Sequence, residues 1–204
     1  MAEHTLPVRN NAGERTLGLN LALNNVYARM RLNQIKVEFV PEHDRLLMRL
    51  ATDSDAEVLL WLTRRCIKRL WPLLMNLAQA APEIALQPNP EARRALLGMQ
   101  HEKAIREADF SKPYQEVERE RPLGQTPLLI TRIHPRRDQQ GRQLLGLLPS
   151  VGQGVHITLD DNLLHGLVRL IQSAVARTDW DLDLQVPQGI TALATEEGGR
   201  PTIN

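Results

Sequence analysis

The stretch that decides the fold runs from position 35 to position 50. It reads Ile35-Lys-Val-Glu-Phe-Val-Pro-Glu-His-Asp-Arg-Leu-Leu-Met-Arg-Leu50. Apolar and polar residues alternate as far as Val40, residues 41–44 have the composition of a turn, and an apolar run resumes after Arg45. This pattern predicts a β-hairpin. A further strand is predicted around residues 17–23.

The segment that follows the hairpin is predicted to form a long helix from about Asp55 to Gln79. Ser54 followed by Glu57 three residues later is typical of a capping box, and Pro72 is expected to kink the helix. Because Cys66 falls on the apolar side, we expect its thiol to be buried and unreactive. The apolar residues at helical spacing are Leu59, Leu62, Cys66, Leu70, Leu73, Leu74 and Leu77.

The middle of the chain is predicted to hold a more polar helix and a connector. Asn89 is a favourable N-cap and Pro90 a favourable first residue for a helix that ends near Asp109. Residues 111–125 are charged and are interrupted by prolines, so we expect them to form a connector.

The second half of the chain repeats the order of strands followed by a helix. Asp160 is predicted to lie near the start of the last helix. In chain order, we expect strands at 127–133, 143–148 and 154–158, a turn at 135–141, a helix from about Asp161 to Arg177, and a closing edge strand at 180–184.

These elements predict an α+β fold of two β-hairpin-plus-helix modules around one core, with an additional polar helix between them. The similar turns Val40-Pro-Glu-His-Asp44 and His134-Pro-Arg-Arg-Asp138 fit a pseudo-twofold duplication and fit chance equally well, because hairpins followed by helices are common. We expect one domain over residues 17–185, comprising a first module with the extra helix (17–110), the connector (111–125) and a second module (126–185). Residues 1–16 and 186–204 are expected to be a loose N-terminus and a flexible tail.

Composition is that of a folded protein from a reducing compartment. Hydrophobic residues make up 42% and charged residues 24% of the 204 residues, and Cys66 is the only cysteine. The N-terminus lacks the pattern of a secretory signal, and no segment approaches 18 consecutive apolar residues. We therefore expect a cytoplasmic protein with no membrane segment.

Charge is distributed unevenly along the chain. Residues 121–143 contain five arginines and one acid, whereas residues 159–204 contain three arginines and seven acids. Such segregation fits an anionic partner or self-association between unlike faces, and it also fits ordinary solvated surface.

The sequence contains no recognisable catalytic, cofactor or metal motif. Gly152 and Gly154 precede a strand, whereas phosphate-binding glycines follow a strand and open a helix. The six histidines lack the spacing of metal ligands, and we expect structural or solvated roles for them, with His165 exposed. An active site assembled from distant residues remains open, but the prediction is a non-enzymatic protein without a cofactor.

The most distinctive predicted surface is on the helix that begins near Asp55. At 100° per residue, Trp61, Arg64, Arg65, Lys68 and Arg69 fall within about 160° of one another, opposite the apolar stripe. An aromatic ring among cations is what a stacking-plus-phosphate surface requires. In the alternative interpretation the second helix or the connector covers this face, and acids there pair with the cations; the candidates are Glu102, Glu107, Glu116 and Glu118.

The function predicted from these features is an interaction or assembly protein. It would bind a protein partner through the basic helix face and the acidic C-terminal region, and we expect a homo-oligomer. Arg136 and Arg137, in the arginine-rich stretch, are further candidate binding residues. The alternative is a single-stranded nucleic-acid-binding protein that uses Trp61 and the surrounding cations. Paired modules of strands followed by a helix resemble Whirly and PUR-type proteins in outline, although fewer strands are predicted here and none of their motifs is present.

Overall fold

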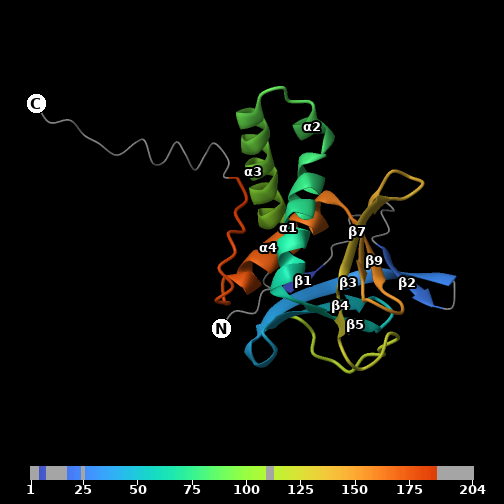
Figure 1. Ribbon diagram of the computed structural model, residues 1–204. Helices are drawn as coiled ribbons and strands as arrows, with labels where there is room; N and C mark the ends of the chain where they lie inside the picture. The colour runs from blue at the N-terminus through green and yellow to red at the C-terminus, as the bar shows by residue number, and fades with distance from the viewer. Residues whose placement is uncertain (1–4, 8–17, 24–25, 109–112, 188–204) are drawn as a thin grey trace, which may run out of the picture.

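The structure is a computed structural model that describes residues 5–7, 18–23, 26–108 and 113–187 (Figure 1). Side chains are described from Leu32 onward. The strands and helices, in chain order, are β1 (Thr5–Pro7), β2 (Gly18–Leu23), β3 (Val26–Val40), β4 (Arg45–Thr52), β5 (Glu57–Leu62), α1 (Arg64–Gln79), α2 (Pro82–Ala85), α3 (Pro90–Glu107), β6 (Leu128–Leu129), β7 (Arg132–Arg137), β8 (Gln143–Leu148), β9 (Val155–Leu159) and α4 (Asp161–Val175).

The described strands form a sheet that β3 divides into two parts. The strand order is β6-β5-β4-β3-β2-β9-β8-β7, with β1 also paired to β3. Residues 26–31 of β3 pair with β2, and residues 32–40 pair with β4 after an irregularity between Leu32 and Gln34. The first part therefore holds β4, β5 and β6, the second part holds β2, β9, β8 and β7, and the long strand β3 joins them (Figure 1).

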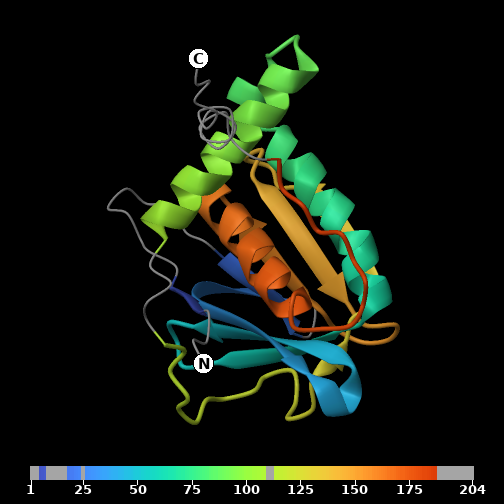
Figure 2. The ribbon, with the colours of Figure 1, turned by 90° about the vertical axis from the view of Figure 1, so that its left-hand side faces the viewer.

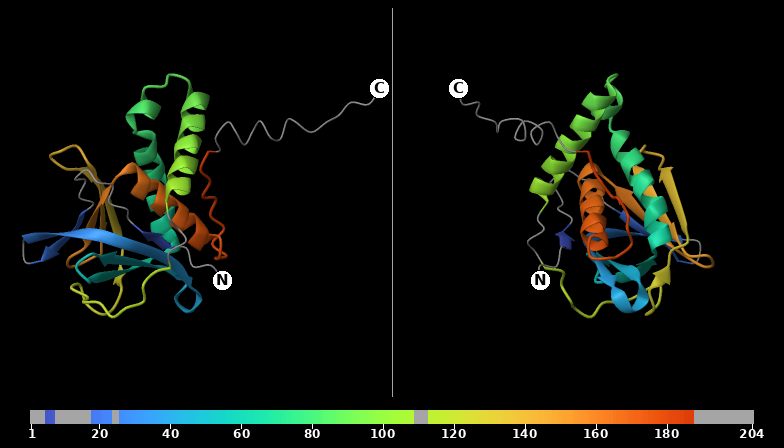
Figure 3. Two further views of the ribbon diagram at one scale, coloured as in Figure 1. Left: turned by 180° about the vertical axis from the view of Figure 1, so that it is seen from behind. Right: turned by 60° about the vertical axis from the view of Figure 1, so that its left-hand side comes forward.

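Helices cover the inner face of this sheet. α4 lies between α3 and α1 (Figures 2 and 3), while α1, α2 and α3 form an arm that rises beyond the strands (Figure 1). Leu60 of β5, Leu70 of α1, Leu145 of β8 and Leu167 of α4 are fully buried in one hydrophobic cluster. Both parts of the sheet thus share a single core with the helices.

The α+β class is confirmed, and so are several predicted elements. A 3₁₀ turn at Pro41–His43 joins β3 to β4 as the predicted hairpin. Asn89 caps α3 by accepting a hydrogen bond from the Glu91 amide, and Asp160 caps α4 by accepting one from the Leu163 amide. The described strands before each long helix are more numerous than one hairpin, since β3–β5 precede α1 and β7–β9 precede α4.

The predicted helix from Asp55 to Gln79 is wrong in its first third. Residues 57–62 form strand β5, which pairs with β4, and α1 begins only at Arg64. The cap is Thr63, whose hydroxyl accepts a hydrogen bond from the Cys66 amide at 3.2 Å. The predicted capping box at Ser54 and Glu57 does not form, because Glu57 is the first residue of β5 and the helix begins seven positions later, at Arg64.

Two predicted features of the second half are also corrected. Residues 127–133 do not form one strand: β6 is short, and β7 continues through Pro135 to Arg137, so the turn begins only at Asp138. Proline is tolerated there because β7 is an edge strand.

Residues 180–184 form no strand, although Trp180, Leu182 and Leu184 do face inward. The C-terminal strap, residues 178–187, instead runs between α4 and α1 (Figures 2 and 3). The domain boundaries remain predictions. Apart from β1, the predicted loose N-terminus lies outside the described residues, as does the tail from residue 188.

Candidate binding surface

The basic face of α1 consists of Arg64, Arg65, Lys68 and Arg69. All four side chains are exposed, while Cys66, Ile67 and Leu70 on the opposite side are buried in the core. No acidic side chain in the described part of the chain forms an ion pair with any of these four cations.

Two of the acids that the alternative interpretation placed over this face lie beside other cations. Glu116 binds Lys36 and Arg49, and Glu107 lies 4.0 Å from Lys103 on its own helix. Within the described residues the basic face therefore faces solvent without an acidic cover.

Positive charge is concentrated at the N-terminal end of α1. The four cations occupy the first two turns, and the first turn contains no acidic residue. A helix N-terminus already carries about half a positive charge, and this effect falls off within the first turn, so Arg64 and Arg65 are each unfavourable to the helix by roughly 0.3–1 kcal/mol. The basic face therefore does not serve the stability of α1.

Trp61 is not part of the basic face, contrary to the prediction. In β5, Val58, Leu60 and Leu62 face the core, and Trp61 alternates with them on the outer side of the sheet. Its ring is half-buried, with its centroid 5.0 Å from that of His43. The helical wheel misplaced Trp61 because it treated a strand as the first turns of a helix.

Arg136 and Arg137 are exposed but lie on a different element, β7, which packs beside α1. Arg137 pairs in register with Gln143, whose Nε2 donates to the Leu77 carbonyl at 3.4 Å. That contact lies in the last turns of α1, eight residues or about 12 Å along the axis from Arg69. The structure thus separates the predicted site residues into the basic face of α1, a pair on β7, and Trp61.

A second group of charges, the Glu57 cluster, was not predicted. It lies on the outer face of the first part of the sheet and contains Lys36, Arg49, Glu57, Tyr114, Glu116 and Arg121. The carboxylate of Glu57 is 1% exposed and accepts hydrogen bonds from Tyr114 Oη at 2.6 Å, Arg49 Nε at 2.9 Å and Arg121 Nε at 3.2 Å.

The Glu57 cluster fastens the connector to the sheet. Tyr114, Glu116 and Arg121 all belong to the connector, and Glu116 bridges Lys36 at 3.1 Å and Arg49 at 2.6 Å. Burial opposes ionisation of Glu57, but the Tyr114 hydrogen bond and the Arg49 charge outweigh it and hold the pKa of Glu57 below its ordinary value. Every charge named here is paired, so we assign the cluster a structural role.

A buried histidine pair joins α3 to α4. His101 and His165 are 8% and 3% exposed, and their Nδ1 atoms are 3.2 Å apart. The prediction that His165 is exposed is therefore wrong, because α3 packs on that side of α4. Burial, together with the charges of His165 and Arg169, lowers the pKa of His101 to about 4, and burial lowers that of His165.

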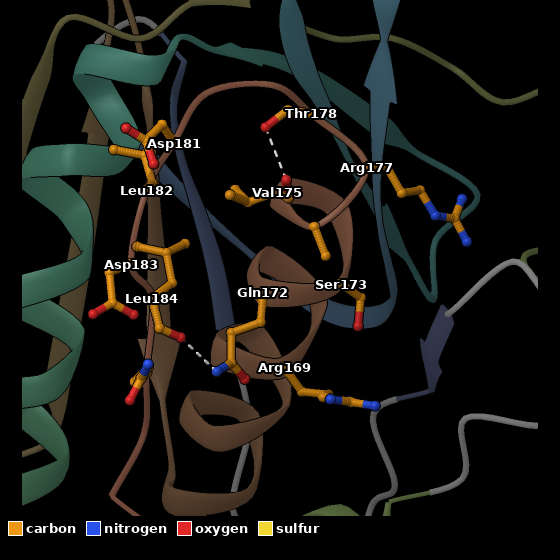
Figure 4. Close-up of a pocket in the computed structure, with 12 residues that line it drawn as sticks. Arg169, Gln172, Ser173, Val175, Arg177, Thr178, Asp181, Leu182, Asp183 and Leu184 are labelled. Atoms are coloured by element: carbon orange, nitrogen blue, oxygen red, sulfur yellow. Dashed lines mark hydrogen bonds between the residues drawn. The ribbon is translucent and has the colours of Figure 1, made fainter.

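A groove of about 740 Å³ lies between α4 and the C-terminal strap (Figure 4). Gln172 Nε2 donates to the Leu184 carbonyl at 2.7 Å and so ties the strap to α4. Arg169 lines one wall, whereas Asp181 and Asp183 on the strap line the other. Opposite charges in the two walls leave the groove without a dominant sign.

Part of the predicted acidic region is on the strap. Asp179, Asp181 and Asp183 are exposed there, while Glu196 and Glu197 lie outside the described residues.

Comparison with known proteins identifies no relative. No family model matches the chain, and neither a curated protein nor a solved structure matches it significantly. Over the described residues, no helix has the length and apolarity needed to cross a membrane, and no three His, Cys, Asp or Glu side chains are grouped to hold a metal ion.

Proposed function

We propose that this protein is a non-enzymatic interaction protein whose basic face on α1 binds an acidic segment of a protein partner. The observation that carries the proposal is that four exposed cations occupy six consecutive positions without an acidic partner among the described residues. Because Arg64 and Arg65 oppose the helix dipole, a partner that neutralises the basic face would account for their presence.

A protein partner is favoured over single-stranded nucleic acid at this face. Base stacking needs an aromatic ring among the cations, and Trp61 lies on the outer side of the sheet beside His43. The exposed acids of the strap offer a second contact surface of the opposite sign. In a homo-oligomer, the strap of one copy would supply the acidic segment for the basic face of the next.

We also propose that the protein acts in the cytoplasm. Cys66, the only cysteine of the chain, is a buried free thiol, which fits a reducing compartment.

The proposal is tested by reversing charge on the basic face. The double variant Arg65→Glu with Lys68→Glu is expected to melt at a temperature no lower than that of the wild type and to lose at least about tenfold in affinity for an acidic peptide such as oligoglutamate. The matched control is Arg93→Glu with Arg94→Glu, two exposed arginines near the start of α3.

Affinity purification with and without nuclease gives the second measurement. A protein partner that survives nuclease treatment, and that the basic-face variant no longer captures, supports the proposal. Equal loss in both double variants would show that only net charge matters, and capture that nuclease abolishes would assign the face to nucleic acid instead.

A further inference from the structure

The outer face of β7, β8 and β9 carries a second cluster that neither the basic face nor the Glu57 cluster includes. His134 of β7 pairs in register with Gly146 of β8, which pairs with His156 of β9. Leu145, Leu147 and Ile157 point into the core and are fully buried. Since side chains alternate along a strand, His134 and His156 lie on the outer face.

The absence of a side chain at Gly146 leaves room for the His156 ring. A methyl group at position 146 would lie 3.1 Å from both Cδ2 and Nε2 of that ring and 3.2 Å from the His134 carbonyl. The imidazole of His156 therefore lies across β8 above the glycine, toward His134 on the neighbouring strand. Only a residue without a side chain allows this approach without displacing the ring.

Arg136 adds a permanent charge to the same face, two positions after His134. It is exposed, and no acidic side chain among the described residues pairs with it. Arg132, also on this face, is held in place by donating from Nε and Nη2 to the Pro149 carbonyl at 3.2 and 2.9 Å. β7 is the edge strand, so this row is open on one side.

Positive charges in this cluster lie close enough to affect one another. Burial, then the charges of Arg136 and His134, lower the pKa of His156. A bound anion would offset the last two effects and favour the protonated form of the His156 imidazole. Two imidazoles and a guanidinium on one face of neighbouring strands can supply charge and directed N–H donors, which is the combination that a phosphate group requires.

We propose that His134, Arg136 and His156 form a phosphate-binding site on the outer face of β7, β8 and β9. The phosphate could belong to a small molecule or to a nucleic-acid backbone, since both present the same oxygens. The backbone register continues from His156 to Asn20 of β2 and from there to Arg29 of β3. This site is separate from the basic face of α1 and does not depend on the function proposed for that face.

The test follows the histidine ring signals by NMR while inorganic phosphate, and separately a short oligothymidylate, is added to the full chain. Saturable shifts of His134 and His156, with a rise in the pKa of His156, are expected. Arg136→Gln should weaken binding about tenfold, because it removes one charge-assisted contact. Arg94→Gln, an exposed arginine of α3, should change it less than twofold.

Gly146→Ala separates a shaped site from general attraction of anions, because it changes no charge. We expect severalfold weaker phosphate binding in this variant with an unchanged melting temperature. If Gly146→Ala unfolds the protein, the comparison of Arg136→Gln with Arg94→Gln still tests whether phosphate binds at this site.

The outcomes of the two titrations separate as follows. Binding of phosphate without tighter binding of the oligonucleotide assigns the site to a small phosphate compound. Tighter binding of the oligonucleotide that Arg136→Gln weakens assigns it to nucleic acid. Absence of saturable shifts, or equal weakening by Arg136→Gln and Arg94→Gln, overturns the proposal.

Discussion

Two groups of charges, the Glu57 cluster and the basic face of α1, behave in opposite ways. In the Glu57 cluster, Arg49 is 14% exposed in its side chain and contacts two carboxylates. On the basic face, Arg65 and its three neighbours are exposed and contact none of the described acids. The first group connects two parts of the same chain, whereas the second has no role within the part that the structure describes.

The difference shows how burial and pairing separate structural charges from those available for binding. A buried charge without its partner is strongly destabilising, so the Glu57 cluster must be complete for the fold to be stable. An exposed charge contributes little to stability either way. Substitutions in the two groups should therefore have effects of different size, and on α1 of different sign.

The largest effect is expected from Glu57→Gln. The change removes the charge that pairs with Arg49 and Arg121 and leaves those guanidinium groups partly desolvated. We expect the free energy of unfolding to fall by about 3 kcal/mol, measured by urea denaturation. Glu118→Gln, at an exposed position of the same connector, should change it by less than about 0.5 kcal/mol. Similar effects of both changes would show that the cluster does not hold the connector.

Burial in the histidine pair favours the uncharged form of His101 in the folded protein. The folded-state pKa of His101, about 4, lies below its ordinary value of 6.5. The folded protein therefore binds fewer protons than the unfolded chain in this range, and stability should fall as pH falls from about 6.5 to about 4.

His101→Gln removes this titration and retains a hydrogen-bonding side chain. Wild type should lose about 2 kcal/mol more than this variant over the same pH range. Parallel pH profiles of the two proteins, measured by urea denaturation, would show that the pair does not titrate between these values.

Cys66 tests the buried side of α1 directly beneath the basic face. Burial, opposed only by the charge of Arg69, raises the pKa of its thiol to about 12. Native protein should react slowly with a thiol reagent at neutral pH and the unfolded chain quickly. Cys66→Ala should cost about 1 kcal/mol and leave partner binding unchanged. Fast labelling of the native protein would contradict the assigned faces of α1.

The smallest expected effect has the opposite sign. Arg65→Glu replaces a cation by an anion in the first turn of α1, where the helix dipole favours negative charge. We expect a gain of about 0.5 kcal/mol in stability, measured by urea denaturation. Arg94→Glu, one turn further into α3, is the control and should be nearly neutral. A clear loss of stability in Arg65→Glu would mean that the basic face is engaged within the chain.

Prediction from sequence succeeded where local patterns decide the structure. The hairpin around residues 41–44, the Asn89 cap and the Asp160 cap depend on neighbouring residues, and all three are present. It failed at Val58–Leu62, because a short apolar run fits a buried strand and a buried helix equally well. Thr63, the cap that marks the true start of α1, was the available signal.

The unpredicted parts of the site depend on contacts between distant residues. His101 meets His165 across 64 positions, and Tyr114 meets Glu57 across 57. Nothing in the neighbourhood of either residue specifies its partner. The alternation of Trp180, Leu182 and Leu184 was interpreted correctly as one inward side, but these residues pair with no strand. Trp180 packs edge-on against Phe39 of β3, and Gln172 of α4 donates to the Leu184 carbonyl.

The place of β2 in the sheet has a consequence for synthesis of the chain. β2 pairs with β9, joining Leu19 to Ile157, and Trp180 Nε1 donates to the Asp44 carboxylate. Both contacts require residues that lie more than 130 positions later in the chain. During translation, the edge of β2 therefore has no partner strand until β9 emerges, and an unpaired edge is prone to association with other chains. The nascent protein is thus exposed to aggregation through this edge until β9 has been made.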